Sequence, residues 1–144
     1  MDDLLREVQA EKEYILDTLR ALNEALQRKE KTAVELAAIS TFLQNTYNGI
    51  ENILKRILKF KGISIPVSES GHKGLIDLSV DNQIISLELS NRLDEYRAFR
   101  HFSIHGYRVL LDKEKLMPLA TNLPDLWKDF ECEVDTFMKS LRSE

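Results

Sequence analysis

Residues 95–108 hold the densest set of chemically capable side chains in this chain of 144 residues. Arg100 and His105 are separated by four residues, and Tyr107 follows one residue later. Histidine is the side chain whose ordinary pKa lies closest to neutral pH, so His105 suits general acid–base work. Arginine stays charged and can form two parallel hydrogen bonds with a phosphate group. The pair therefore fits chemistry at a phosphodiester.

The spacing of Arg100 and His105 sets a condition on the local fold. On an uninterrupted helix, five residues correspond to a rotation of about 500°, which leaves the two side chains roughly 140° apart. We therefore expect the helix to end or unwind between them, as the neighbouring Gly106 favours. The alternative is an ordinary cluster of cations at a helix C-terminus. Spacing alone favours that alternative.

Other residues are weaker candidates for contact with a nucleic acid. Arg97 lies about one helical turn before Arg100 on the same face, and Arg108 follows Tyr107. Tyr96 and Phe99 could stack on a base, but their helical spacing beside leucines favours the core. A second basic group could line a nucleic-acid path or be ordinary C-terminal cations of a helix: Lys55, Arg56, Lys59 and Lys61.

Hydrophobic periodicity predicts that helices position these residues. Apolar side chains recur at steps of three and four residues, and no alternating strand pattern persists. Thr32 and Glu35 form a capping-box pattern, and Gly62 ends the helix that follows. The predicted helices cover residues 3–29, 33–61, 72–81, 86–104 and 113–142.

These elements predict an all-α fold, an up-and-down bundle of four to five helices in a single domain over residues 1–144. The first two long helices should form an antiparallel hairpin because only a short break joins them. Pro118 and Pro124 lie inside the last segment, which is therefore either a kinked helix or two helices in series.

Composition excludes several classes of protein. Five Gly and three Pro, with 31% charged and 43% apolar residues, argue against a turn-rich all-β fold. The single cysteine, Cys132, cannot form an internal disulfide or a Cys-rich zinc site. No apolar run reaches the ~18 residues of a membrane span, and the acidic start is not a signal peptide. We expect a soluble cytoplasmic protein with no metal, cofactor or membrane association.

The net charge of −4 at first argues against nucleic acid as a partner. Residues 1–30 carry eight acids and five bases, and residues 112–144 carry the same numbers. Residues 31–111 carry ten bases and eight acids. The middle of the chain is therefore slightly basic, which leaves room for a local RNA contact.

The arrangement of Arg100, His105 and Tyr107 resembles the R-X4-H-X-Y motif of the HEPN superfamily in its HepT branch. His101 stands where that branch has a polar residue after the arginine. The likeness extends over nearly the whole chain, because further segments resemble helices two to five of the family: residues 41–57, 72–76, 93–101 and 117–127.

The resemblance implies a dimeric, metal-independent endoribonuclease toxin of a type VII-like HEPN/MNT toxin–antitoxin pair. Its partner would be an MNT-type nucleotidyltransferase antitoxin that transfers AMP onto the motif tyrosine. Carried over to this sequence, Arg100 and His105 would be catalytic, His101 would support them and Tyr107 would accept AMP.

The chemistry of RNA is consistent with these roles, since the 2′-OH beside the scissile phosphate supplies the nucleophile. His105 would deprotonate that hydroxyl or protonate the leaving 5′-oxygen, and Arg100 would stabilise the added negative charge. One such histidine per chain is incomplete for both acid and base, so a homodimer is expected. AMP on Tyr107 would add negative charge and bulk beside the site.

Two alternatives of other classes stay open. The chain could be a non-catalytic helical binding partner of a nucleotidyltransferase, or a structural helical dimer. The enzyme is favoured because a pure adaptor has no need of Arg100, His101, His105 and Tyr107 together.

Overall fold

The computed structural model describes residues 1–65, 71–105 and 113–143, and of residues 71–73 and 102–105 it describes the backbone only. Throughout the described chain, the regular structure is helical, so the all-α prediction is confirmed. Every predicted helix is present, with bounds that differ by at most two residues from those expected. The helices are α1 (Asp2–Gln27), α2 (Ala33–Phe60), α3 (Gly71–Asp81), α4 (Leu87–His105) and α5 (Lys113–Arg142).

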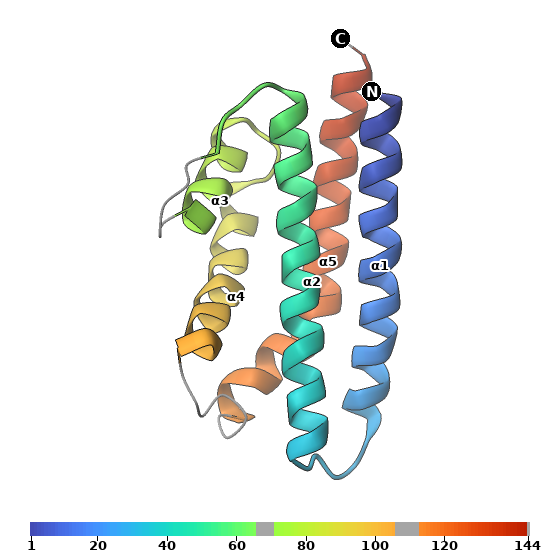
Figure 1. Cartoon of the computed structure of the whole chain (residues 1–144), viewed down its shortest axis with the longest axis vertical. Helices are drawn as coiled ribbons and strands as arrows, with labels where there is room; N and C mark the ends of the chain where they lie inside the picture. Colours follow the sequence, from blue (N-terminus) through green and yellow to red (C-terminus); the bar gives the residue numbers. More distant parts are fainter. Residues whose placement is uncertain (66–70, 106–112, 144) are drawn as a thin grey trace.

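The long helices alternate in direction, as an up-and-down bundle requires. In Figure 1, α1 and α4 descend while α2 and α5 ascend, and the short α3 precedes α4. The first two helices form the predicted antiparallel hairpin. Helix α2 packs against each of the other four helices, so it is the central element of the bundle.

The central position of α2 explains its pattern of burial. Twelve of its 28 residues are buried, and Ile39, Leu43, Ile50 and Ile57 are fully enclosed. Four exposed residues follow one another at steps of four, three and four, which places them along one face of the helix. We call this face the α2 stripe: Asn48, Asn52, Lys55 and Lys59.

Both ends of α2 form as the sequence predicts. The Thr32 hydroxyl accepts a hydrogen bond from the Val34 backbone N–H at 3.2 Å, and the Thr32 N–H donates to Glu35 Oε2 at 3.0 Å. The hydrogen bond from the Thr32 side chain is the main reason that the pKa of Glu35 is lowered. Gly62 follows the helix with φ of 75°, a conformation that favours glycine.

Helix α5 is one continuous element that contains both Pro118 and Pro124. The alternative of two helices in series is therefore wrong. Figure 1 shows that its first turns (orange) run at an angle to the rest (red), which agrees with a kinked helix. Proline removes a backbone donor and crowds the preceding turn, so a bend in this part of the helix is expected.

Contacts with α5 hold α4 in place. Ser86 accepts from the Leu89 N–H at 3.1 Å, and its own N–H donates to Glu133 at 2.6 Å. About one turn after Leu89, Arg92 forms an ion pair with Asp129 at 2.6 Å. The Tyr96 hydroxyl donates to the Leu119 carbonyl at 2.7 Å. These contacts anchor α4 along the turns that precede Arg100.

Among the described residues, no helix is long and apolar enough to cross a membrane.

The capping box gives a first testable prediction. Thr32→Ala should lower the free energy of unfolding by about 1 kcal/mol, because the first turn of α2 loses its side-chain acceptor. Thr32→Ser, which keeps the hydroxyl, serves as the matched control. Urea unfolding followed by circular dichroism measures both. Equal stability of the alanine and serine variants would contradict a role for the cap.

Candidate active site

Helix α4 continues through the predicted catalytic pair. Its backbone is helical from Leu87 to His105, so the expectation that the helix ends or unwinds after Arg100 is wrong. Gly106, which was expected to mark the end of the helix, lies outside the described residues. In a regular helix, residues 100 and 105 stand about 140° apart around the axis. The two backbone positions therefore lie on different sides of α4.

Arg100 is partly buried against α2, where it forms an ion pair with a buried acid. Its Nη1 donates to Glu51 Oε1 at 2.8 Å and to Asn48 Oδ1 at 2.6 Å. The side chain of Arg100 is 11% exposed and that of Glu51 is 3% exposed. The guanidinium also lies over the ring of Tyr47, 5.1 Å from its centroid. This is unlike the solvent-exposed cation that an ordinary helix C-terminus carries.

The position of Glu51 in α2 explains why this pair forms. Tyr47, Glu51 and Leu54 follow one another at steps of four and three residues, and all three are buried. A carboxylate on such a face enters the core with the apolar side chains around it. Burying an unpaired charge costs several kcal/mol, so the fold needs a cation opposite Glu51. Arg100 supplies it from α4.

Tyr47 stays a neutral phenol beside this pair. Burial raises its pKa well above the ordinary value of 10, and the carboxylate of Glu51 raises it further. Arg100 and Arg97 lower it by less. The ring therefore acts chiefly as an aromatic surface beneath the Arg100 guanidinium.

The other predicted site residues on α4 occupy different surroundings. His101 is exposed to solvent beside Arg100. Arg97 is half-buried, and its Nε donates to Asp94 Oδ1 at 2.9 Å. Tyr96 and Phe99 are 3% and 4% exposed, which confirms that they belong to the core.

The remaining residues of the predicted site are only partly covered by the structure. The backbone of His105 closes α4, and its side chain is not described. Tyr107 and Arg108 lie outside the described residues. The roles assigned to these residues and to Arg100 therefore stay predictions.

The second basic group divides into three kinds of environment. Arg56 pairs with Glu7 at 3.0 Å and with Glu11 at 3.3 Å. Lys61 lies 5.3 Å from the centroid of the Phe137 ring. Lys55 and Lys59 are exposed, and neither forms an ion pair with another described residue. The last two are the members whose charge stays available to a ligand.

The sequence did not predict a role for the residues that hold Arg100, which are Glu51, Asn48 and Tyr47. The predicted site residues are mainly cations and histidines, whereas a different sequence pattern marks Glu51. It is an acid inside the apolar periodicity of α2, at a position that the neighbouring spacing marks as buried. Asn48 and Tyr47 lie within one turn of it and would follow from the same reading. In the described part of the chain, no three His, Cys, Asp or Glu residues are grouped to hold a metal ion.

Comparison with known protein families gives a match over most of the chain. A family model described as "HepT-like protein" matches residues 38–141, a range that begins in α2 and ends in the last turn of α5. No curated protein and no solved structure matches the chain. The matched range includes the Arg100–Glu51 pair and the predicted motif.

The buried ion pair gives a second prediction. Arg100→Met alone should lower the free energy of unfolding by about 3–5 kcal/mol, because Glu51 is left charged and unpaired in the core. Glu51→Leu alone should cost about as much for the opposite charge. The double variant should recover most of the loss, because apolar side chains of similar size replace both charges. Urea unfolding of the four proteins gives the coupling, and additive losses would show that the pair is not energetically joined.

Proposed function

Because this chain belongs to the HepT-like family of the HEPN superfamily, we propose that it is a metal-independent endoribonuclease toxin that cleaves RNA with Arg100 and His105. The proposal rests above all on Arg100, which stands in the R-X4-H-X-Y arrangement and is fixed against α2 by Glu51 and Asn48. A positive charge held in place before the reaction stabilises developing negative charge without the cost of reorganisation. Such a charge is what a phosphorane needs.

His105 completes the chemistry in this proposal. It removes the proton from the 2′-OH or returns one to the leaving 5′-oxygen, with the 2′-oxygen displacing the 5′-oxygen at phosphorus. Since α4 is helical to His105, residues 100 and 105 stand on different sides of the helix. Two chains related by a two-fold axis would place Arg100 and His105 of both chains around one phosphodiester. The active species is therefore a homodimer.

Neutralisation by a partner follows from the same motif. In this proposal an MNT-type nucleotidyltransferase antitoxin transfers AMP from ATP onto Tyr107 in the cytoplasm: the phenol oxygen bonds to the α-phosphorus as its proton is lost, and pyrophosphate leaves. The phosphate adds negative charge and bulk two residues from His105, which repels RNA. The acidic ends of the chain offer a surface to a basic partner. Arg97 and Arg108 are secondary contacts for RNA.

The burial of Arg100 favours a second candidate function. A side chain that is 11% exposed and paired with a buried acid also suits a purely structural role. The chain would then be a non-catalytic helical partner of a nucleotidyltransferase.

Cleavage in the presence of EDTA tests the proposed function. Purified protein should cut single-stranded RNA, and His105→Ala should reduce the rate by about 10²–10⁴-fold, since a general acid–base group is lost. For Arg100, the informative variant is the double Arg100→Met with Glu51→Leu, because the single change should also destabilise the core. Equal melting temperatures of the double variant and the wild type serve as its control. Absence of cleavage by the wild type would favour the non-catalytic partner, whereas full activity of both variants would contradict the catalytic roles of Arg100 and His105.

The role of Tyr107 is tested separately. Co-expression with a nucleotidyltransferase encoded beside this gene should raise the mass of the chain by one AMP group, and peptide mass spectrometry should place that group on Tyr107. Tyr107→Phe should abolish the modification and leave cleavage active in the presence of the partner. A modified Tyr107→Phe variant would show that another residue accepts AMP.

A further inference from the structure

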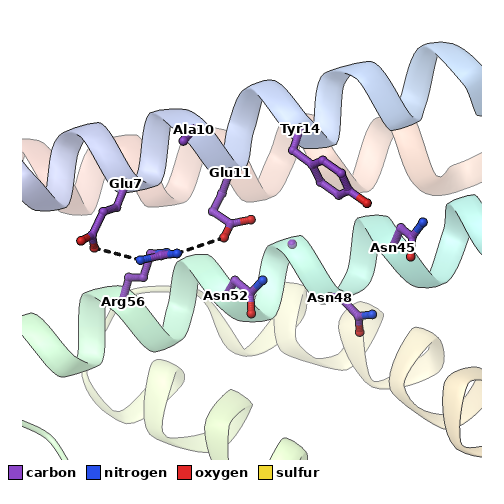
Figure 2. A pocket seen from close by; sticks show the side chains of 9 residues that line it. Glu7, Ala10, Glu11, Tyr14, Asn45, Asn48, Asn52 and Arg56 are labelled. Carbon is purple, nitrogen blue, oxygen red and sulfur yellow. Dashed lines mark hydrogen bonds and ion pairs between the residues drawn. The ribbon is translucent and has the colours of Figure 1, made fainter.

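A shallow groove runs between α1 and α2, with a volume of about 540 Å³. Figure 2 shows Arg56 at one end, bonded to two glutamates, and Tyr14 at the other, reaching from α1 toward α2. The floor lies at Gly49, where α1 comes so close that a Cβ would stand 2.7 Å from Ile15 Cγ1. The wall supplied by α2 carries three amide side chains: Asn45, Asn48 and Asn52.

The electrostatics of the groove exclude an anion as its ligand. Arg56 is its one cation, and it already pairs with Glu7 at 3.0 Å and Glu11 at 3.3 Å. Two carboxylates against one guanidinium leave this end with a net negative charge. A phosphate or carboxylate group would therefore be repelled.

The remaining side chains fit a flat ring with polar edges. Each asparagine amide offers two donors and an acceptor, so one amide can bond both kinds of group on a base edge. Tyr14 is 52% exposed and presents an aromatic ring at the same groove. Aromatic stacking together with hydrogen bonds at the edges is how proteins bind unpaired bases. We propose that the α1–α2 groove binds a nucleobase, supplied by the single-stranded RNA that Arg100 engages, an inference that rests on the proposed function.

One residue connects this groove to Arg100. Asn48 lines the groove, and its Oδ1 also accepts the hydrogen bond of 2.6 Å from Arg100 Nη1. Figure 2 shows its side chain on the lower edge of α2, away from α1. A single side chain thus stands between the groove and the guanidinium. An RNA strand with one phosphate at Arg100 brings a nearby base to the groove.

The α2 stripe supplies the path for the backbone of that strand. Beyond Asn48 and Asn52, the stripe continues with Lys55 and Lys59, both exposed and without an ion pair among the described residues. Within α2, no acidic residue interrupts this face, because Glu51 is buried. Glu7 and Glu11 belong to α1 and pair with Arg56 across the groove. Phosphates follow the lysines, while the amide-lined part of the groove beside Tyr14 takes a base.

Binding is measured on the full chain with His105→Ala, so that the RNA stays intact. Fluorescence anisotropy with a short labelled single-stranded RNA gives the affinity. Tyr14→Ala should weaken binding by about 5- to 150-fold, the range expected for one lost base stack. Tyr14→Phe should bind as the parent does, and Asn45→Leu should weaken binding and change the base preference. Leu16→Ala, an exposed truncation on the same helix outside the groove, should have no effect.

The stripe is tested through the dependence of affinity on salt. Lys55→Gln and Lys59→Gln should each reduce the slope of log K against log salt by about 0.7, the value for one phosphate contact on a single strand. Lys128→Gln, an exposed lysine of α5, is the matched control and should leave the slope unchanged.

Competition separates the sources of the base. If AMP, CMP, GMP or UMP displaces RNA at comparable concentration, and Tyr14→Ala weakens that binding, the groove takes free nucleotides. If mononucleotides fail to compete, the base is read within RNA. The proposal is overturned if Tyr14→Ala and Asn45→Leu bind RNA like the parent, if nothing binds, or if Tyr14→Ala dissociates a dimer.

Cleavage distinguishes this inference from the proposed function. If the protein cleaves RNA but the groove variants bind RNA like the parent, the nucleobase site is disproved and the proposed nuclease function stands. If RNA binding depends on Tyr14 but the protein with His105 intact cleaves no RNA, the proposed nuclease function is contradicted and the nucleobase site stands.

Discussion

The ion pair between Glu51 and Arg100 is the constraint on which the candidate site depends. A carboxylate 3% exposed in the face of the central helix cannot stay charged there without a cation, and α4 is the helix that delivers one. This fixes the register of α4 along α2. The contacts of α4 with α5, Arg92 with Asp129 and Tyr96 with Leu119, hold α4 from its other side. The turn that carries Arg100 and His101 is therefore positioned from two directions.

Much of the fold follows from the sequence because helices obey local rules. Apolar periodicity, the Thr32 cap and Gly62 act within a few residues, so the five helices were predicted with nearly their observed bounds. The partner of Arg100 was not predicted, because it depends on how α2 and α4 align. Glu51 and Arg100 are 49 residues apart in the chain. The expected break before His105 failed for a different reason. It assumed that one chain must bring both residues to one face, and α4 is regular to its end.

Ion pairs between the helices change how the charge of the chain is understood. Opposite charges join α1 to α2 and to α5, through Arg56 with two glutamates and Lys12 with Asp135 at 2.5 Å. These oppositely charged side chains neutralise one another within the bundle, so the net charge of −4 says little about the charge of any one surface. Lys55 and Lys59 stand apart from this network. They make the exposed face of α2 more basic than the composition suggests.

Pairing with Glu51 also limits what Arg100 can do alone. A guanidinium beside a carboxylate carries little net charge, so it attracts RNA weakly from a distance while still donating hydrogen bonds at short range. In the proposed function, binding and chemistry are assigned to different helices. The lysines of the α2 stripe would supply attraction, and α4 would supply the fixed arginine and the histidine. Such a division would make the rate of cleavage sensitive to small movements of α4 against α2. It also gives a reason for a buried pair that holds these two helices in one register.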